Sequence, residues 1–231
     1  MRQENRKDLR WVQGAADALE LLARAFSFPD IELARALVDG RFADDAASCA
    51  ADLAISASTK TALDELRMFE GADPEALLSE MRRIFSRLYL VTGRDGTLYP
   101  YEGAFKFMAE GRPGEPSVFA NRSALDMGRL LKAEGLEPDP ERHEPADSIW
   151  FELAYLSLLY GRLWQALNEG SGSAVSAGEL RGKIEEFQQV HGRPWMMAFM
   201  ERTQNETQGV YCALASWASA ALSCVLGTSD E

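Results

Sequence analysis

Histidine, cysteine and carboxylate side chains are the residues of this sequence that could bind a metal ion. The chain has two histidines, three cysteines and 36 aspartates and glutamates. A di-metal site in a helical bundle needs Glu-x-x-His pairs, and neither His143 nor His191 has a glutamate three residues before it. No cysteine lies close in sequence to either histidine, as a mixed zinc site would require. The sequence therefore predicts no metal site and no bound cofactor.

Nucleophilic catalysis needs a serine or cysteine beside an oriented base, and the sequence contains no G-x-S-x-G stretch. The glycines of GRPGEPS, residues 111–117, lack the lysine and the strand-to-helix context of a phosphate-binding loop. We expect no catalytic residues. An enzyme of unrecognised type is the least favoured alternative.

The charge balance favours a peptide partner over nucleic acid. The 24 lysines and arginines stand against 36 aspartates and glutamates, for a formal net charge of -12. Such a surface repels phosphate backbones and attracts a basic peptide. Cys49, Cys212 and Cys224 are odd in number and form no C-x-x-C pair, which indicates a reducing compartment. The first residues lack the apolar run of a secretory signal, so we expect a cytoplasmic protein.

Apolar residues recur at helical spacing through most of the chain, which predicts an all-α bundle of about ten helices. Pro74 suits the first position of the clearest amphipathic helix. The uncharged run 207–229 is long enough to span a membrane, but its alanines and serines and its single apolar stripe predict a buried helix. The expected helices cover residues 11–28, 31–38, 42–57, 59–69, 74–89, 121–135, 145–164, 179–191, 194–203 and 206–226.

Glycines and prolines interrupt this pattern between residues 93 and 120, where a long continuous helix is excluded. We interpret this segment as a hinge and aromatic loop between an N-terminal half, residues 1–92, and a C-terminal half, residues 121–231. The two halves could also form one compact domain. A hinge of this kind permits either a monomer or a dimer that exchanges halves between chains.

Two further stretches have the composition of a binding surface. LYPYEGAFKF, residues 98–107, places aromatic rings at alternating positions after a rigid proline. Some of these rings could fill the interface between the halves, and others could line a groove for a peptide. In EPADSIWFE, residues 144–152, Pro145 at a first helical position would put Asp147 at the third, near free backbone N–H groups. Asp147 is then a helix cap, or also part of a rim that faces a cation, since residues 137–147 carry a local charge of about -4.

A late stretch, FQQVHGRPWMMAFMERT, joins a helix end to a proline restart at residues 187–203. His191 near a helix C-terminus is interpreted as a packed or dipole-facing residue in preference to a functional base. Trp195 has the spacing of a core residue. Both residues are nevertheless candidates for a binding role, because of the pattern described next.

These three stretches, in this order, resemble the TorD/DmsD/NarJ-like redox enzyme maturation chaperones, which assemble molybdoenzymes. YPYEGAF resembles the family's proline-aromatic hinge motif, often P-x-Y-E-S. Pro145, Asp147 and Glu152 resemble P-x-D-H-x-x-x-E, and Phe187, His191, Pro194 and Trp195 resemble F-x-x-x-H-x-x-P-W. Two positions depart from the pattern: Ser148 replaces a histidine, and Gly103 replaces a frequent serine.

The resemblance implies a cytoplasmic, system-specific chaperone. It would bind the twin-arginine signal peptide, the apo form of a molybdoenzyme catalytic subunit, or both, until cofactor insertion and export, with a transient association with the export machinery. A helical scaffold or oligomerisation module that binds a folded partner is the alternative. The residues expected to contact the peptide are Tyr99, Pro100, Tyr101, Glu102, Phe105, Glu144, Pro145, Asp147, Ser148, Glu152, His191 and Trp195.

Overall fold

The chain forms an all-α structure, seen in a computed structural model that describes residues 2–90, 98–136, 144–169 and 175–227, with side chains from residue 7 onward. These residues contain eleven α-helices and two π-helical segments, and their only β-type pairing is an isolated bridge between Tyr101 and Ser148. The predicted fold class is confirmed. The elements are α1 (Arg2–Phe26), α2 (Ile31–Val38), α3 (Arg41–Asp52), α4 (Lys60–Arg67), α5 (Pro74–Phe85), η1 (Ser86–Leu90), α6 (Glu102–Ala109), α7 (Arg122–Ala133), α8 (Ile149–Glu169), α9 (Ala177–Phe187), η3 (Gln188–Gly192), α10 (Met196–Glu206) and α11 (Val210–Leu226).

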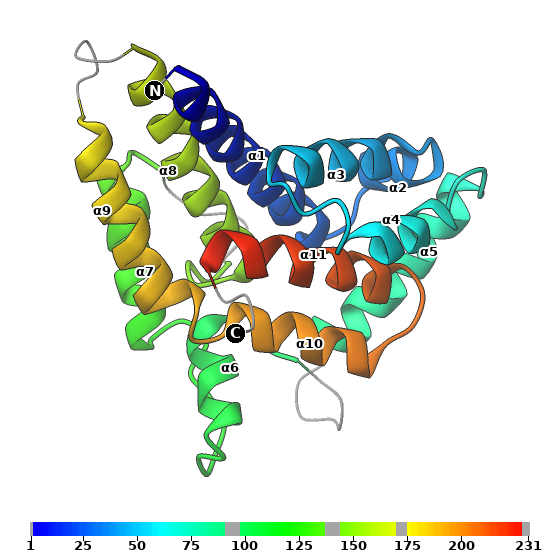
Figure 1. Ribbon diagram of the computed structural model, residues 1–231. Coiled ribbons are helices and arrows are strands. Elements are labelled where there is room, and N and C mark those ends of the chain that lie inside the picture. Colours follow the sequence, from blue (N-terminus) through cyan, green and yellow to red (C-terminus); the bar gives the residue numbers. More distant parts are fainter. Residues whose placement is uncertain (1, 91–97, 137–143, 170–174, 228–231) are drawn as a thin grey trace.

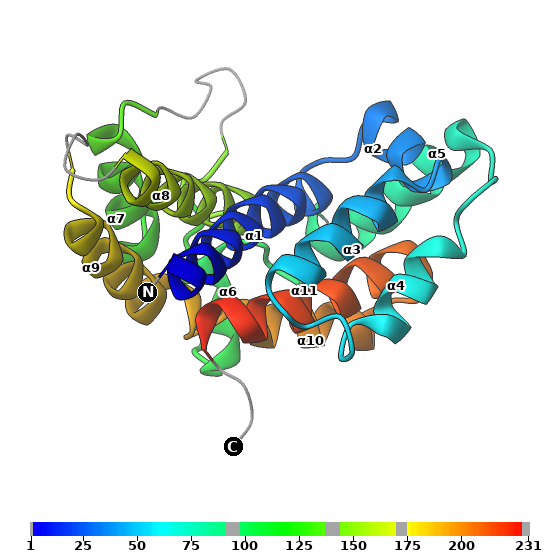
Figure 2. The same cartoon turned by 45° about the horizontal axis from the view of Figure 1, so that its top comes forward.

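Helix α1 packs lengthwise against α8, although the two helices are far apart in the sequence (Figure 1). In Figure 2, α2 to α5 lie to the right of α1, α7 to α9 lie to its left, and α10 and α11 lie below it. Helix α11 packs against both α10 and α4. Elements from both expected halves therefore contact one another, and the division at residues 93–120 stays a prediction.

The helix starts follow from local capping. Asp30, Asp73 and Asn121 each accept a hydrogen bond from the backbone N–H three residues later, at the starts of α2, α5 and α7. Pro74 occupies the first position of α5, as predicted. Ser176 and Glu179 form a reciprocal capping box at α9. These bonds satisfy backbone donors that the helices leave free.

The uncharged segment near the end of the sequence is α11, and it lies in the core. Its stripe at Val210, Leu214, Trp217, Ala221 and Val225 is buried, which confirms the prediction of a buried helix. Trp217 packs edge-on against a phenylalanine of α3. Across the part of the chain that the structure describes, no helix has the length and apolarity needed to cross a bilayer.

The expected hinge is partly helical. Residues 102–109 form α6, a helix of eight residues that the glycine and proline content did not reveal. The backbone instead turns after α6, at Gly111 and Gly114, which both adopt positive φ. Residues 91–97, at the beginning of the expected hinge, lie outside the described residues.

Candidate functional site

The hinge motif and the EPADSIWFE motif lie side by side. The backbone N–H of Glu102 donates to the carbonyl of Asp147 (2.9 Å), and the N–H of Ile149 donates to the carbonyl of Pro100 (2.9 Å). This short antiparallel pairing holds the start of α6 against the start of α8. Two segments more than 40 residues apart in sequence thus form one site.

Helix α8 begins at Ile149, so the prediction that Pro145 occupies its first position is wrong. Residues 145–148 form a turn, in which the N–H of Ser148 donates to the carbonyl of Pro145 (3.3 Å). Ser148 precedes the helix, and its hydroxyl accepts a long hydrogen bond from the N–H of Phe151 (3.4 Å). Ser148 therefore lies where a capping residue would.

Asp147 caps a different helix from the one expected. Its Oδ2 accepts a hydrogen bond from the N–H of Gly103 (3.0 Å) in the first turn of α6. Burial raises the pKa of the Asp147 carboxyl, and the hydrogen bond from the Gly103 N–H opposes that rise. Its other oxygen, Oδ1, has no partner among the described residues. The rest of the acidic run, residues 137–143, lies outside the described part of the chain.

Gly103 is also closely packed. A Cβ atom at this position would overlap the side chain of Asn121, which caps α7 and bonds to the carbonyls of Ser117 and Val118. A serine at 103 would require Asn121 to move. The departure from the family motif at this position thus fits the asparagine that packs against it.

Glu102 connects the start of α6 to the π-helical segment η3. Its Oε2 lies 2.7 Å from Nδ1 of His191, and its other oxygen accepts a hydrogen bond from Lys106 one turn later. Burial pushes the pKa of Glu102 up, yet the hydrogen bonds from His191 and Lys106 hold it below its ordinary value. Glu102 is therefore a buried carboxylate with two partners.

Glu152, on α8, completes this buried network. Trp195 Nε1 donates to its Oε2 (2.8 Å), whereas Oε1 has no hydrogen-bond partner among the described residues. Burial and the nearby charge of Glu102 raise the pKa of Glu152 well above its ordinary value. The pKa values of these two neighbouring carboxyl groups therefore shift in opposite directions, that of Glu102 downward and that of Glu152 upward.

Glu102, Glu152 and His191 are also the described residues best placed to hold a metal ion, since one ligand atom from each lies within 4.8 Å of the others. Lys106 and His191 both contact the Glu102 carboxylate, so the buried charge of Glu102 has partners within the protein. The three sequence motifs therefore meet in a buried polar network that fastens α6, α8 and η3 together.

Most of the expected peptide contacts belong to this network or to the core. Of the twelve residues, nine are buried and three, Tyr99, Tyr101 and Glu144, are half-buried. Phe105 packs against Trp195 at a ring-centroid distance of 5.6 Å. Direct contact of the buried residues with a peptide stays a prediction, and their internal partners give them a positioning role in this conformation.

The half-buried residues line an aromatic pocket of about 410 Å³. Trp150 forms one wall: its Nε1 donates to Glu144 (3.2 Å), and its ring meets that of Tyr101 edge-on at 6.0 Å between centroids. Burial and the charges of Glu144 and Asp147 raise the pKa of Tyr101 to about 12. The pocket is lined by Phe28, Phe85, Tyr89, Leu90, Tyr99, Tyr101, Val118, Phe119, Glu144, Pro145 and Trp150.

Sequence reasoning missed several of these residues. Phe28, Leu90 and Phe119 line the pocket with exposed fractions of 48%, 48% and 61%. Exposed apolar side chains that gather around one pocket often mark an interaction site. Phe28 directly precedes a proline, and Phe119 lies in the glycine- and proline-rich stretch. An aromatic residue beside helix-breaking residues was therefore the sequence signal that could have identified these two positions.

The fold and site define an all-α protein with an aromatic pocket supported by a buried polar network. Residues 52–201 match the family described as "Nitrate reductase delta subunit", and the chain belongs to this family. It is also 30% identical to "Chaperone protein TorD" of Vibrio cholerae serotype O1 over 144 residues, which are 61% of this chain and 58% of that relative. These findings confirm the resemblance to the TorD/DmsD/NarJ-like chaperones. The chain thus matches less than two thirds of that relative's length, and no solved structure matches the chain.

Proposed function

We propose that this protein is a molybdoenzyme maturation chaperone that binds the twin-arginine signal peptide of a catalytic subunit, its apo form, or both. It holds the client in the cytoplasm until cofactor insertion and export, and catalyses no reaction. Family membership and the similarity to a protein named as a chaperone support this proposal. The observation that carries it is the aromatic pocket with its three exposed apolar side chains, Phe28, Leu90 and Phe119.

The pocket suits the apolar part of such a peptide. Burial of one leucine-type side chain contributes roughly 1.5 to 3 kcal/mol, whereas an exposed ion pair contributes about 0.2 to 1 kcal/mol. Apolar contacts should therefore supply most of the affinity. The acidic surface should mainly set the orientation of the peptide and its association rate.

Calorimetric titration with a synthetic signal peptide tests this proposal. Replacement of two leucines in the apolar run should weaken binding more than replacement of both arginines. On the protein, Phe119→Ser should weaken binding roughly tenfold, because it removes one apolar contact of about 1.5 kcal/mol. Phe119 is 61% exposed, so the substitution should spare the core.

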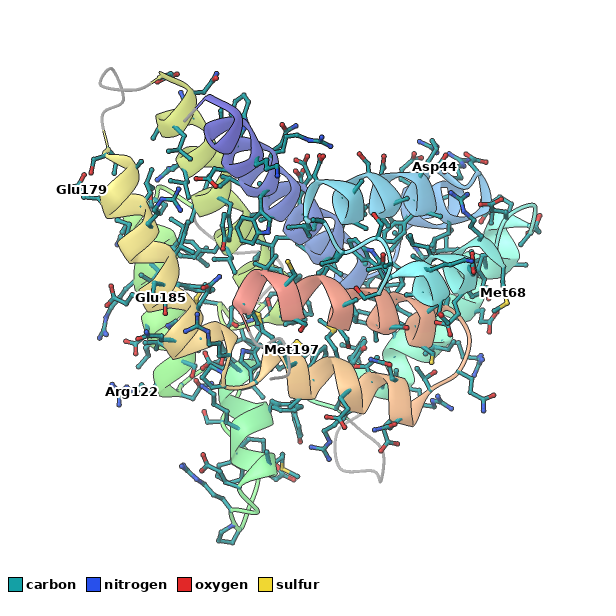
Figure 3. All side chains as sticks on the ribbon, viewed as in Figure 1. Asp44, Met68, Arg122, Glu179, Glu185 and Met197 are labelled. Carbon is teal, nitrogen blue, oxygen red and sulfur yellow. The ribbon has the colours of Figure 1, made fainter. Side chains whose placement is uncertain are left out.

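Met68→Ser is the matched control. Met68 is 75% exposed at the end of α4, at the outer edge of the molecule (Figure 3), and lines none of the cavities described here. The Met68→Ser substitution should leave the affinity for the signal peptide unchanged. The proposed apolar site would be contradicted if Phe119→Ser and Met68→Ser lowered the affinity equally. It would also be contradicted if replacing the peptide's arginines lowered the affinity more than replacing its leucines.

Purification of the protein with its bound client from the native host tests the wider proposal. We expect a molybdoenzyme subunit or a signal-bearing precursor to be recovered. A folded partner that binds equally well without any signal peptide would instead favour the scaffold alternative, and turnover abolished by a single substitution would favour an enzyme.

A further inference from the structure

A second cavity, of about 670 Å³, opens where α1, α3 and α8 meet. Its rim is acidic: Asp17 and Glu20 lie on α1 and Asp45 on α3, all three are exposed, and none forms an ion pair with another described residue. We call it the acidic groove. It is lined by Asp17, Glu20, Leu21, Ala23, Arg24, Ser27, Asp45, Ser48, Cys49, Trp150, Phe151 and Ala154.

The carboxylates of the acidic groove repel one another. Partial burial and the charges of Glu20 and Asp52 raise the pKa of Asp17 above its ordinary value. The one arginine on the rim, Arg24, is paired with Asp30. A cation that entered the groove would therefore relieve an existing repulsion and would not have to displace an internal ion pair.

The floor of the acidic groove is apolar, and one side chain joins it to the aromatic pocket. Trp150 lines both cavities. The segment directly after α1 joins them as well, since Ser27 lines the groove and the adjacent Phe28 lines the pocket. The two cavities are thus neighbours, the first acidic and the second aromatic.

We propose that the acidic groove binds the basic segment of a peptide whose adjacent apolar residues occupy the aromatic pocket. This inference rests on the proposed function and assigns the position and orientation of the ligand. The occupant is a guanidinium-bearing segment. A guanidinium can bond to two carboxylates at once, and its methylene stem can lie along apolar surface such as Leu21 and Phe151.

The closeness of the two cavities also limits the distance between the basic and apolar segments of the ligand. Because the groove and the pocket share Trp150, the basic and apolar segments must be close together in the peptide. A peptide with the same composition but a long polar spacer between the two segments should gain little from its arginines. The acidic groove would then discriminate between peptides with and without a nearby basic segment, while the aromatic pocket would supply most of the affinity.

Binding of two synthetic peptides to the purified full chain tests the proposal. One peptide has Arg-Arg before an apolar run, and the other has Gln-Gln in its place. Wild-type protein should bind the Arg-Arg peptide about three- to tenfold more tightly at low salt. The double variant Asp17→Asn/Asp45→Asn should lose this preference and retain its affinity for the Gln-Gln peptide.

The double variant Asp64→Asn/Glu201→Gln is the matched control, since it removes two exposed carboxylates from α4 and α10 that line neither cavity. It should keep the preference for the Arg-Arg peptide. Asp17→Asn/Asp45→Asn should also unfold at the same or a higher temperature than wild type, because it removes repulsion from the free protein. A loss of binding would then not reflect misfolding.

Each other outcome has a defined meaning. If the Asp17→Asn/Asp45→Asn variant still prefers the Arg-Arg peptide, or binds both peptides more weakly by the same factor, the basic segment does not bind in the acidic groove. If Phe119→Ser still weakens both peptides in that case, the proposed function stands without this inference. If wild-type protein binds neither peptide, both fail.

Discussion

At the scale of single residues, Glu152 is the side chain whose protonation the fold controls most strongly. It is fully buried, with one oxygen bonded to Trp195 and the other without a hydrogen bond among the described residues, and the carboxylate of Glu102 lies nearby. Its pKa is raised well above the ordinary value of 4.5. The folded protein thus keeps a proton that the unfolded chain releases as the pH rises above that value. Wild-type stability must fall with rising pH on account of this residue, until the pH passes the raised pKa.

Glu152→Gln should remove this pH dependence, because an amide cannot ionise and can still accept the hydrogen bond from Trp195. We expect the variant to match wild type near pH 4 and to become progressively more stable than wild type towards pH 8. Urea unfolding at a series of pH values measures the difference. Glu201→Gln, an exposed substitution on α10, is the control. A difference that stays constant with pH would show that Glu152 ionises alike in both states.

At the scale of elements, the starts of α6 and α7 are fitted to each other through Gly103 and Asn121. Gly103→Ala should destabilise the protein by about 1 to 3 kcal/mol, since the new Cβ overlaps the Asn121 side chain. Helix propensity alone predicts the opposite sign. In an Asn121→Ser background, which keeps a capping hydroxyl for α7, the same change should cost little. Thermal unfolding of the four proteins measures the coupling, and equal costs in both backgrounds would contradict it.

The elements also show what the sequence could predict. Helix α2 coincides with its expected range, and α5, α7, α9 and α11 follow from apolar periodicity and local caps. The start of α8 was misplaced because Asp147 caps α6, through a contact 44 residues away in sequence. Local rules assign a carboxylate to the nearest helix, and only the fold shows which N-terminus it faces.

The candidate site was predictable in part for the same reason. The motifs identified Glu102, Glu152 and His191, but their pairing in one buried network joins three distant segments. The aromatic pocket combines Phe28 from the segment after α1, Phe119 from the loop before α7 and Trp150 from α8. Tertiary packing brings these rings together, and the spacing of residues along the sequence does not predict that they are close in space.

At the scale of the whole molecule, the net charge of -12 and the acidic groove should act mainly before a basic peptide is bound. Long-range attraction raises the rate of encounter and is screened when the Debye length falls from about 30 Å at 0.01 M salt to about 3 Å at 1 M. Apolar contacts in the aromatic pocket persist once the peptide is bound, so they should set the rate of dissociation.

Stopped-flow fluorescence with a labelled Arg-Arg peptide separates these two effects. Between 0.02 and 0.5 M salt we expect the association rate constant to fall about tenfold or more and the dissociation rate constant to change little. Phe119→Ser should do the reverse and mainly speed dissociation, because the exposed ring is removed without any change of charge. If salt instead accelerated dissociation and left association unchanged, the carboxylates would act by short-range contact in the complex, and steering by the molecule's overall charge would be ruled out as their main role.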